Sequence, residues 1–283
     1  MKKYIILITL AVLIILIPIY LYFENTTLEL TYYTVNSDKI SDEFDNYTIA
    51  QITDFHNINS KRLTENQLVN NLKINKPDII VITGDLIDSR TTNIDIAISF
   101  INQIQHIAPI YYVTGNHESR VEEYSKLETL LKESNVIVLR NEKILLPNSN
   151  IELIGVDDPS FHKQNDNLKE MKSYMNKQLS SLTQNTTNND TYKILLSHRP
   201  ELFNSYIENN IDLIFSGHAH GGQIRLPFIG GLIAPNQGFP PKYIDNIYTM
   251  ENSNLVVSRG IGNSLFPFRI NNRPELVFVK LTK

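Results

Sequence analysis

The segment Ile211-Asp212-Leu213-Ile214-Phe215-Ser216-Gly217-His218-Ala219-His220 is a largely apolar run that ends in a glycine and two histidines one residue apart. Such a run predicts a buried β-strand, and α/β sheets place their binding sites at the carboxyl ends of strands. Histidines at that position are candidate metal ligands. A lone His-x-His pair is more often a surface or core feature, so this interpretation depends on partners elsewhere in the chain.

Four earlier segments of the sequence end in the same way. Each is a strand-like apolar run, and each is followed directly by Asp, Asn or His. These polar residues are, in chain order, Asp54, His56, Asp85, Asn116, His117 and His198. Together with the histidine pair, five strand ends carry such residues. Agreement at all five is a strong signal for one site at an edge of an α/β sheet.

Composition limits the classes of function and ligand. The 283 residues suffice for one large domain with a well-filled core, and we find no second domain. The net charge of -4 gives no electrostatic basis for nucleic-acid binding. The chain has no cysteine, which excludes disulfides, thiolate zinc sites and cysteine nucleophiles. Any metal ligands must therefore be nitrogen or oxygen atoms.

An apolar run extends from Tyr4 to Phe23 and is interrupted only by Thr9 and Pro18. Twenty helical residues reach roughly 30 Å, which is the thickness of the bilayer core, so we predict a membrane span. A buried core helix would rarely lack polar positions so completely. A cleaved signal peptide would have a shorter apolar region that ends in small residues.

Charges on either side of this run predict its orientation. Lys2 and Lys3 precede it, Glu24 follows it, and the next lysine is Lys39. By the positive-inside rule, the amino end stays in the cytoplasm and the rest lies on the extracytoplasmic side of the cell membrane. We therefore divide the chain into an anchor (1–23), a tether that enters the domain as an edge strand (24–46), and a single domain (47–283).

Strand-like and helical patterns alternate from Tyr47 onward. This βαβ rhythm predicts an α/β fold with parallel strand pairing. After Gly222 the pattern changes to shorter β-like pieces that include 254–258 and 276–281. The helical candidates lie at about 64–75, 93–106, 122–133, 167–182 and 201–209.

The strand-end motifs together resemble those of the calcineurin-like metallophosphoesterase superfamily. They are Asp54-x-His56, Gly84-Asp85, Gly115-Asn116-His117-Glu118, Ser197-His198 and Gly217-His218-Ala219-His220. The resemblance assigns 47–283 to a metallophosphoesterase domain. It implies a four-layer sandwich of two mixed β-sheets flanked by helices, here preceded by one N-terminal transmembrane helix. The amino-terminal anchor, 196–201, 221–223 and 273–275 resemble the membrane-associated bacterial branch.

The resemblance also implies a dinuclear metal centre. Its ligands would be Asp54, His56 and His220 for one metal, Asn116, His198 and His218 for the other, and Asp85 as the bridge. A carboxylate has two oxygens and can span two ions, as phosphatase sites require. Mixed histidine and carboxylate ligation suits Mn, Fe, Zn or Ni, and the choice among these divalent ions stays open.

The reaction implied by the resemblance is hydrolysis of a phosphoester by a metal-bridging hydroxide, without a protein nucleophile. His117 would protonate the leaving oxygen or bind the phosphoryl group. The alternative is that His117 only orients a ligand. The resemblance favours the catalytic role.

The anchor favours a membrane or cell-surface phosphoester as substrate, a class that includes lipid-linked phosphoesters. One alternative is a pyrophosphatase for UDP-2,3-diacylglucosamine-type lipids, but that substrate is cytoplasmic and conflicts with the predicted orientation. A second alternative is a metal-binding interaction protein on the same fold. The intact set of seven ligands and His117 argues against this non-enzymatic alternative.

Several residues outside the ligand set have open interpretations. Glu118 is either an acceptor for a ligand histidine or a helix-start carboxylate. Asp157-Asp158 is more typical of a solvated loop than of another metal site. Each of Arg225, Arg259 and Arg269 is more typical of a structural salt bridge than of a phosphate contact.

The stretch 226–235 follows the histidine motif and is apolar, glycine-rich and uncharged. We favour burial of this stretch against the sheet. The alternative is an exposed wall for a lipid chain.

Overall fold

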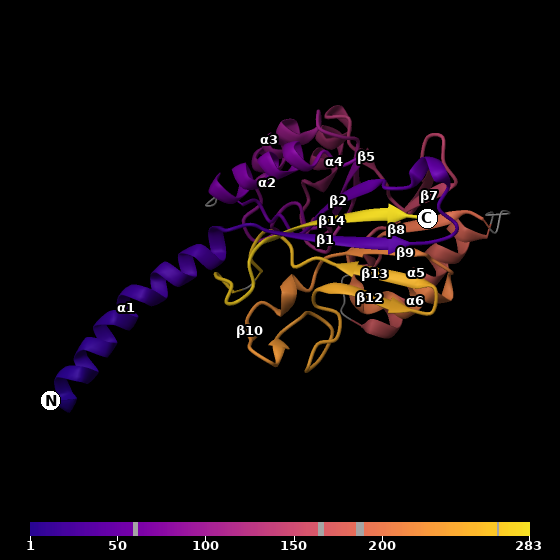
Figure 1. The fold of residues 1–283 in the computed structure, drawn as a ribbon. Coiled ribbons are helices and arrows are strands. Elements are labelled where there is room, and N and C mark those ends of the chain that lie inside the picture. Colours follow the sequence, from indigo (N-terminus) through magenta and orange to yellow (C-terminus); the bar gives the residue numbers. More distant parts are fainter. Residues whose placement is uncertain (59–61, 164–166, 185–189, 265) are drawn as a thin grey trace.

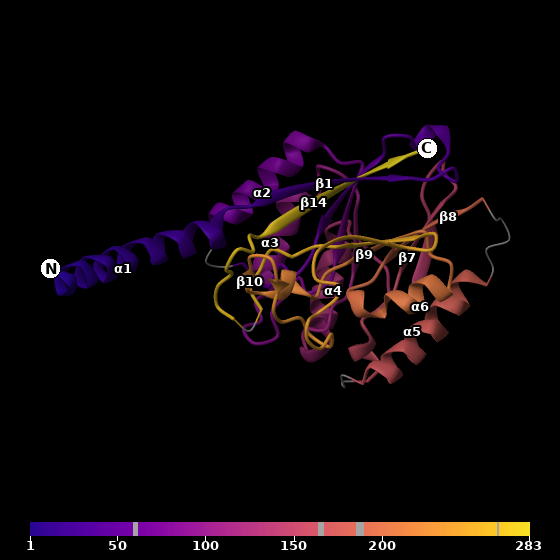
Figure 2. The same ribbon diagram turned by 60° about the horizontal axis from the view of Figure 1, so that its bottom comes forward.

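A computed structural model describes residues 1–58, 62–163, 167–184, 190–264 and 266–283. Two mixed six-stranded sheets pack against each other, and helices cover their outer faces (Figures 1 and 2). The expected four-layer α/β sandwich is confirmed. Between the sheets lies an apolar core with side chains from both, such as Val81 and Val113 from one and Leu196 and Phe215 from the other.

The first sheet has the strand order β1-β14-β2-β3-β4-β5. Only the β14–β2 pair is antiparallel among its ladders. The fully buried run of β3 is typical of a parallel strand that is covered on both faces. The strands are β1 (Glu29–Asn36), β2 (Thr48–Ile52), β3 (Ile79–Thr83), β4 (Ile110–Val113), β5 (Ile137–Val138) and β14 (Glu275–Thr282).

The second sheet has the order β12-β13-β9-β8-β7-β6. Its central pairs are parallel, whereas the outermost pair on each side is antiparallel. The predicted parallel pairing therefore holds for the centre of both sheets. The strands are β6 (Glu142–Leu145), β7 (Ile151–Gly155), β8 (Tyr192–Leu196), β9 (Leu213–Ser216), β12 (Asn246–Met250) and β13 (Ser253–Val257).

Helices α2 (Arg62–Asn75), α3 (Ile94–Ile104) and α4 (Tyr124–Glu133) cover the first sheet, and α5 (Leu168–Thr183) and α6 (Phe203–Glu208) cover the second. Asn93 and Asn167 cap α3 and α5 with their side-chain oxygens. Short 3-10 turns are η1 (Asp42–Phe44), η2 (Glu118–Arg120), η3 (Pro159–Phe161), η4 (Pro200–Leu202) and η5 (His220–Gly222).

A small hairpin follows the histidine motif and consists of β10 (Arg225–Leu226) and β11 (Gly230–Gly231). Phe228 and Ile229 lie at its tip with exposed fractions of 109% and 62%. The favoured burial of this stretch is therefore wrong for both side chains. The reason is that the hairpin is a separate two-stranded ribbon and not part of either large sheet.

The amino-terminal helix α1 (Lys2–Thr26) projects from the domain (Figure 1) and is long and apolar enough to cross a membrane. Its carboxyl end is joined to the domain by Tyr20, Glu24 and Asn25, which bond to the segment 269–273. The strand after it, β1, lies at an edge of the first sheet. The division at residues 23 and 46 stays a prediction.

Candidate metal centre

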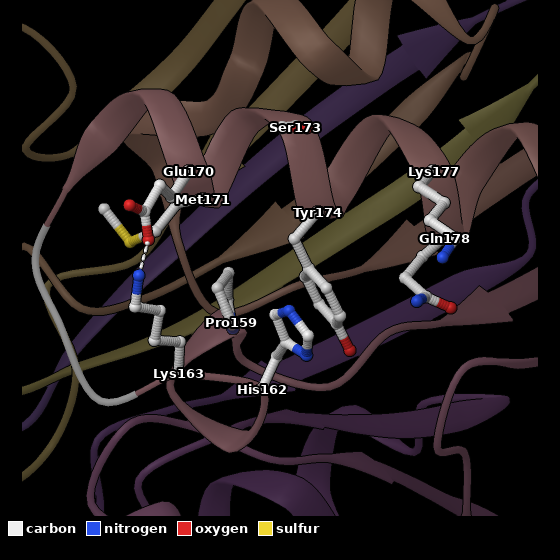
Figure 3. A pocket seen from close by; sticks show the side chains of 9 residues that line it. All are labelled: Pro159, His162, Lys163, Glu170, Met171, Ser173, Tyr174, Lys177 and Gln178. Atoms are coloured by element: carbon white, nitrogen blue, oxygen red, sulfur yellow. Dashed lines mark hydrogen bonds and ion pairs between the residues drawn. The ribbon is translucent and has the colours of Figure 1, made fainter.

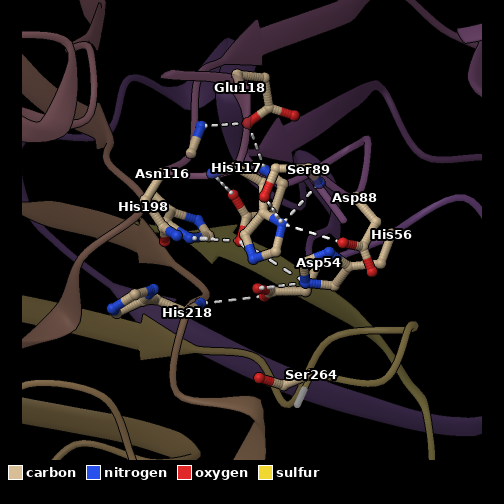
Figure 4. Close-up of polar contacts among 12 residues, drawn as sticks. Asp54, His56, Asp88, Ser89, Asn116, His117, Glu118, His198, His218 and Ser264 are labelled. Carbon is tan, nitrogen blue, oxygen red and sulfur yellow. Dashed lines mark hydrogen bonds and ion pairs between the residues drawn. The ribbon is translucent and has the colours of Figure 1, made fainter. Parts of the chain in front are cut away.

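The predicted site residues lie at the carboxyl ends of β2, β3, β4, β8 and β9, where the two sheets meet. Their side chains converge from both sheets (Figure 4). Three overlapping groups of possible ligands lie side by side. The first is Asp54, His56 and His220, and the second contains Asp85, His198 and His218. The third, His56, Asp85 and His117, shares one residue with each of the other two.

The first group is closely spaced. The Nε2 atom of His220 lies 3.2 Å from Oδ1 of Asp54 and 3.3 Å from Nε2 of His56. The distance between His56 Nε2 and Asp54 Oδ1 is 3.8 Å. All three side chains are buried. One oxygen and two nitrogen atoms thus point into one space.

Asp85 connects the first and second groups. Its Oδ1 atom accepts a hydrogen bond from the backbone N–H of His117 at 2.8 Å. Its Oδ2 atom lies 3.6 Å from Nε2 of His56 and 3.3 Å from Nε2 of His198. A single oxygen of Asp85 therefore faces both groups, while the other oxygen is bound by the backbone of His117.

Unsatisfied atoms in the site test whether these residues fit metal ions. The ligand atoms Asp54 Oδ1, Asn116 Oδ1, His198 Nε2 and His218 Nε2 are buried and have no hydrogen-bond partner in the described part of the chain. Buried polar atoms without a partner are costly and uncommon. Because these donors converge and are of the nitrogen and oxygen type that divalent transition ions prefer, the site fits such ions.

A backbone carbonyl fixes the orientation of His198. Its Nδ1 atom donates to the carbonyl of Thr83 at 2.8 Å. This bond directs Nε2 toward Asp85, which is the arrangement in which a backbone acceptor orients a metal-binding imidazole.

The loops that present the ligands have unusual backbone angles. Asp54, His56, Asp85, His218 and His220 all have positive φ, between 47° and 66°. Such conformations cost free energy in non-glycine residues and concentrate at functional sites. The preceding glycines allow close approach: a Cβ on Gly217 would lie 2.4 Å from Asp54 Oδ2, and one on Gly115 would lie 2.2 Å from Asp85 Oδ1.

Burial sets the protonation of most ligand histidines. It lowers the pKa of His56 to about 3 and the pKa values of His218 and His220 well below their usual range. For His198, burial lowers the pKa, but the nearby Asp85 carboxylate outweighs it and raises the pKa to about 10. Metal ions bind neutral imidazole, so the lowered pKa values of His56, His218 and His220 favour the form that binds a metal.

His117 points into the same space but is held differently. Its Nδ1 atom accepts a hydrogen bond from the backbone N–H of Ser89 at 3.0 Å. In the neutral ring the proton is therefore on Nε2, which lies 3.9 Å from Asp85 Oδ2. This orientation presents an N–H donor to the metal site.

The sequence analysis missed three residues next to His117. Asp88 Oδ1 lies 3.4 Å from His117 Nδ1, and Asp88 also binds the Arg90 guanidinium through both oxygens. Ser89 supplies the backbone donor described above. A signal was present, because Asp88 is a second acid only three positions after Asp85 at the same strand end.

Glu118 has a role that neither interpretation described. Its buried carboxylate accepts backbone hydrogen bonds from Asp85, Leu86, Ile87 and Gly115, at 2.7 to 3.2 Å. It lies at the start of η2 but binds no ligand histidine. It therefore holds the loop that carries Asp85 against the loop that carries Asn116.

We expect Glu118→Gln to weaken metal binding by about 10–100-fold, the usual cost of losing a group that orients ligands. One amide oxygen cannot accept from the four N–H groups that the carboxylate now binds. Calorimetric titration of the metal-free protein with Mn²⁺ measures this loss of metal affinity. The exposed Glu122→Gln is the matched control, and equal affinities in the two variants would contradict this role.

The acids Asp157 and Asp158 are buried, so the prediction of a solvated loop is wrong. Asp157 binds Arg140 through both oxygens. Asp158 binds the buried guanidinium of Arg199, with an Nε–Oδ2 distance of 2.7 Å. Arg140 and Arg199, which are 17 and 41 positions away in the sequence, neutralise these two acids and so allow their burial.

We expect Arg199→Met to lower the free energy of unfolding by about 3–5 kcal/mol, because it leaves the Asp158 carboxylate buried without its partner. Urea unfolding followed by circular dichroism measures the change. The exposed Lys163–Glu170 pair supplies the control: Lys163→Met should cost less than about 1 kcal/mol. Similar losses in both variants would contradict the assignment.

The favoured structural salt bridges are confirmed for Arg225 and Arg259, whereas Arg269 binds backbone carbonyls instead of a carboxylate. Arg225 pairs with Asp245, and Arg259 pairs with Glu275. Arg269 donates to backbone carbonyls, including that of Arg259 at 2.9 Å.

Four of the seven candidate ligands line a surface pocket together with His117 and residues of later loops. The lining residues are Asp85, Ser89, Arg90, Asn116, His117, Arg120, His218, His220, Pro235, Asn236 and Ser264. Arg90 is paired with Asp88, whereas Arg120 is exposed and its charge favours an anionic ligand.

A second pocket lies between η3 and α5, where His162 stacks on Tyr174 with ring centroids 4.9 Å apart (Figure 3). None of its lining residues belongs to the predicted site. His162 thus lies outside the candidate metal centre.

Comparison with known proteins agrees with this geometry. Residues 47–222 match the family model "Calcineurin-like phosphoesterase". The chain is 28% identical to the uncharacterized metallophosphoesterase YkuE of Bacillus subtilis, over 92% of this chain and 87% of the relative. It is 26% identical to the phosphodiesterase YaeI of Escherichia coli, over 73% and 71% of the two chains.

Among solved structures, a dimetal phosphatase from Danio rerio shares the fold. The TM-score is 0.51 at 14% identity, with 77% of this chain and 88% of that chain covered.

Proposed function

Since this chain belongs to the calcineurin-like phosphoesterase family and is a metal-dependent phosphoesterase, we propose that it hydrolyses a membrane or cell-surface phosphoester at a dinuclear centre. The observation that carries the proposal is the position of Asp85 Oδ2, which faces His56 on one side and His198 on the other. One carboxylate oxygen placed between two ligand groups is suited to a pair of ions.

The ligands we propose are Asp54, His56 and His220 for one ion, Asn116, His198 and His218 for the other, and Asp85 for both. When bound, two divalent ions would activate water as the nucleophile and stabilise charge on the phosphoryl oxygens. The donor set suits Mn, Fe, Zn or Ni. The described ligand atoms without hydrogen-bond partners support this assignment.

The remaining roles belong to groups around the pocket. His117 presents an Nε2 proton, and we assign it to the leaving oxygen of the phosphoester. Asp88 lies next to Nδ1, the other nitrogen of the His117 ring, and its negative charge favours the protonated form of His117. Arg90 and Arg120 line the pocket, where the charge of Arg120 attracts an anionic substrate.

We place the domain outside the cytoplasm, with α1 crossing the membrane. Lys2 and Lys3 before the helix support this orientation. Protease added to intact cells should then cleave the domain and leave α1 protected; a protected domain would reverse the orientation. The reversed orientation would also favour the second candidate substrate, a UDP-2,3-diacylglucosamine-type pyrophosphate in the cytoplasm.

Turnover by the full-length protein in lipid nanodiscs tests the function. The substrates are a chromogenic phosphomonoester and a chromogenic phosphodiester, each assayed with Mn²⁺ and with chelator. We expect turnover that requires the metal, and the ratio of the two rates defines the ester class. Tight metal binding without turnover of either ester, or of a lipid pyrophosphate, would instead favour the metal-binding interaction protein.

A further inference from the structure

Six large apolar side chains are exposed on two loops that follow the histidine motif. Their exposed fractions range from 40% for Leu226 and Phe266 to 109% for Phe228. We call this set the apolar collar. Its members are Leu226, Phe228, Ile229, Ile233, Phe239 and Phe266.

The two loops of the collar carry no formal charge. Residues 226–240 and 261–268 contain no Asp, Glu, Lys, Arg or His. Exposed apolar surface of this kind marks a protein or membrane contact. The absence of charge also removes the main penalty for entering the interface of a bilayer.

Hydrogen bonds join the collar to the carboxyl end of α1. The Tyr20 hydroxyl donates to Oδ1 of Asn271 at 2.8 Å, and the Asn271 side chain in turn donates to the carbonyl of Arg225, where the hairpin begins. Asn25 exchanges hydrogen bonds with the backbone of Arg269, which follows Phe268 directly. Both loops of the collar are therefore fixed at the level of the helix end.

The two ribbon views agree with this placement. The β10 hairpin lies at the end of the domain from which α1 leaves (Figures 1 and 2). Aromatic residues such as Tyr20, Tyr22 and Phe23 at the end of a membrane helix usually lie at the lipid headgroups. If α1 spans the bilayer, the collar faces that same surface.

We propose that the apolar collar inserts into the lipid bilayer beside α1, so that the metal pocket opens at the level of the headgroups. The same two loops supply Pro235, Asn236 and Ser264 to the wall of that pocket. A phospholipid substrate then reaches the pocket by lateral diffusion and keeps its acyl chains in the membrane. This choice of substrate class rests on the function proposed above, whereas insertion of the collar does not.

The first experiment uses the lack of tryptophan in the chain. Ile229→Trp places one probe in the collar, and Leu145→Trp places one on β6 with nearly the same exposure, 62% against 61%. Each full-length variant is reconstituted in vesicles of phosphatidylcholine and phosphatidylglycerol with brominated acyl chains. We expect strong quenching of the Ile229→Trp fluorescence and little quenching of the Leu145→Trp fluorescence.

Two results of this experiment would overturn the proposal. Equal quenching at the two positions would mean that the collar stays in water. An emission shift of Ile229→Trp that depends on protein concentration and not on lipid would mean that the collar binds a second copy of the chain.

The second experiment compares two phosphodiesters with the same leaving group, phosphatidyl-p-nitrophenol in vesicles and bis(p-nitrophenyl) phosphate in water. The double variant Phe228→Asp, Ile229→Asp should hydrolyse the lipid about tenfold or more slowly, because charged side chains oppose insertion, and should hydrolyse the soluble diester at the parent rate. Equal rates on the lipid would contradict the role of the collar. Absence of turnover of both diesters by the parent would rule out a phospholipid diester as substrate, while the fluorescence result would still decide insertion.

Discussion

Asp85→Asn should reduce metal-dependent turnover by at least about 10²–10³-fold, the loss that follows removal of one group that stabilises charge in the transition state. The reason lies in the hydrogen bond from the His117 N–H to Oδ1. An amide at this position must keep its oxygen toward that donor. Its NH₂ group would then face His56 and His198, where a metal ligand is required.

The measurements are kcat/KM for a chromogenic phosphodiester and the metal content of the purified variant. Asp95→Asn is the matched control, because Asp95 is exposed on α3 and is not among the candidate ligands. We expect the control to keep both ions and full activity. If Asp85→Asn also kept both ions and full activity, the Asp85 carboxylate would not be a shared ligand.

The second large effect concerns His117. We expect His117→Gln to lower kcat by about 10²–10⁴-fold on an alkyl phosphoester, which is the usual contribution of general acid catalysis. A nitrophenyl ester should be affected much less, because its leaving group departs without a proton. Metal content should stay unchanged, since His117 is outside the proposed ligand set.

The comparison of leaving groups separates the two catalytic roles. Equal losses on both esters would show that His117 binds the phosphoryl group instead of protonating the leaving oxygen. Unchanged rates on both esters would mean that His117 only orients a ligand. His106→Gln, at an exposed position outside the motifs, controls for the loss of a histidine.

The sequence predicted the strand ends well, because their signals are local. An uninterrupted apolar run such as 79–83 can be buried on both faces only inside a covered sheet, and the polar residue after it must lie at the sheet edge. The same argument predicted that Asp54, Asn116 and His198 lie close together at this edge. Their metal-binding roles stay predictions for the experiments above.

Contacts between loops were not predictable in this way. Three of the four amide donors of Glu118 lie more than 30 positions before it, at Asp85, Leu86 and Ile87, and nothing in the pattern marks them. The burial of Asp158 depends on Arg199, which is 41 positions away. Phe228 is exposed because it lies at the tip of a hairpin whose strands have two residues each. The apolar composition of the stretch did not reveal this hairpin and alone favoured burial.

The positive φ angles of the ligand residues link metal binding to the stability of the whole protein. Each such conformation costs on the order of 1–3 kcal/mol in a non-glycine residue, and five ligand residues share it. Ions that bind only the folded chain offset this cost by mass action. If the proposed ions bind at this site, we therefore expect a chelator to lower the free energy of unfolding of the protein as well as its activity.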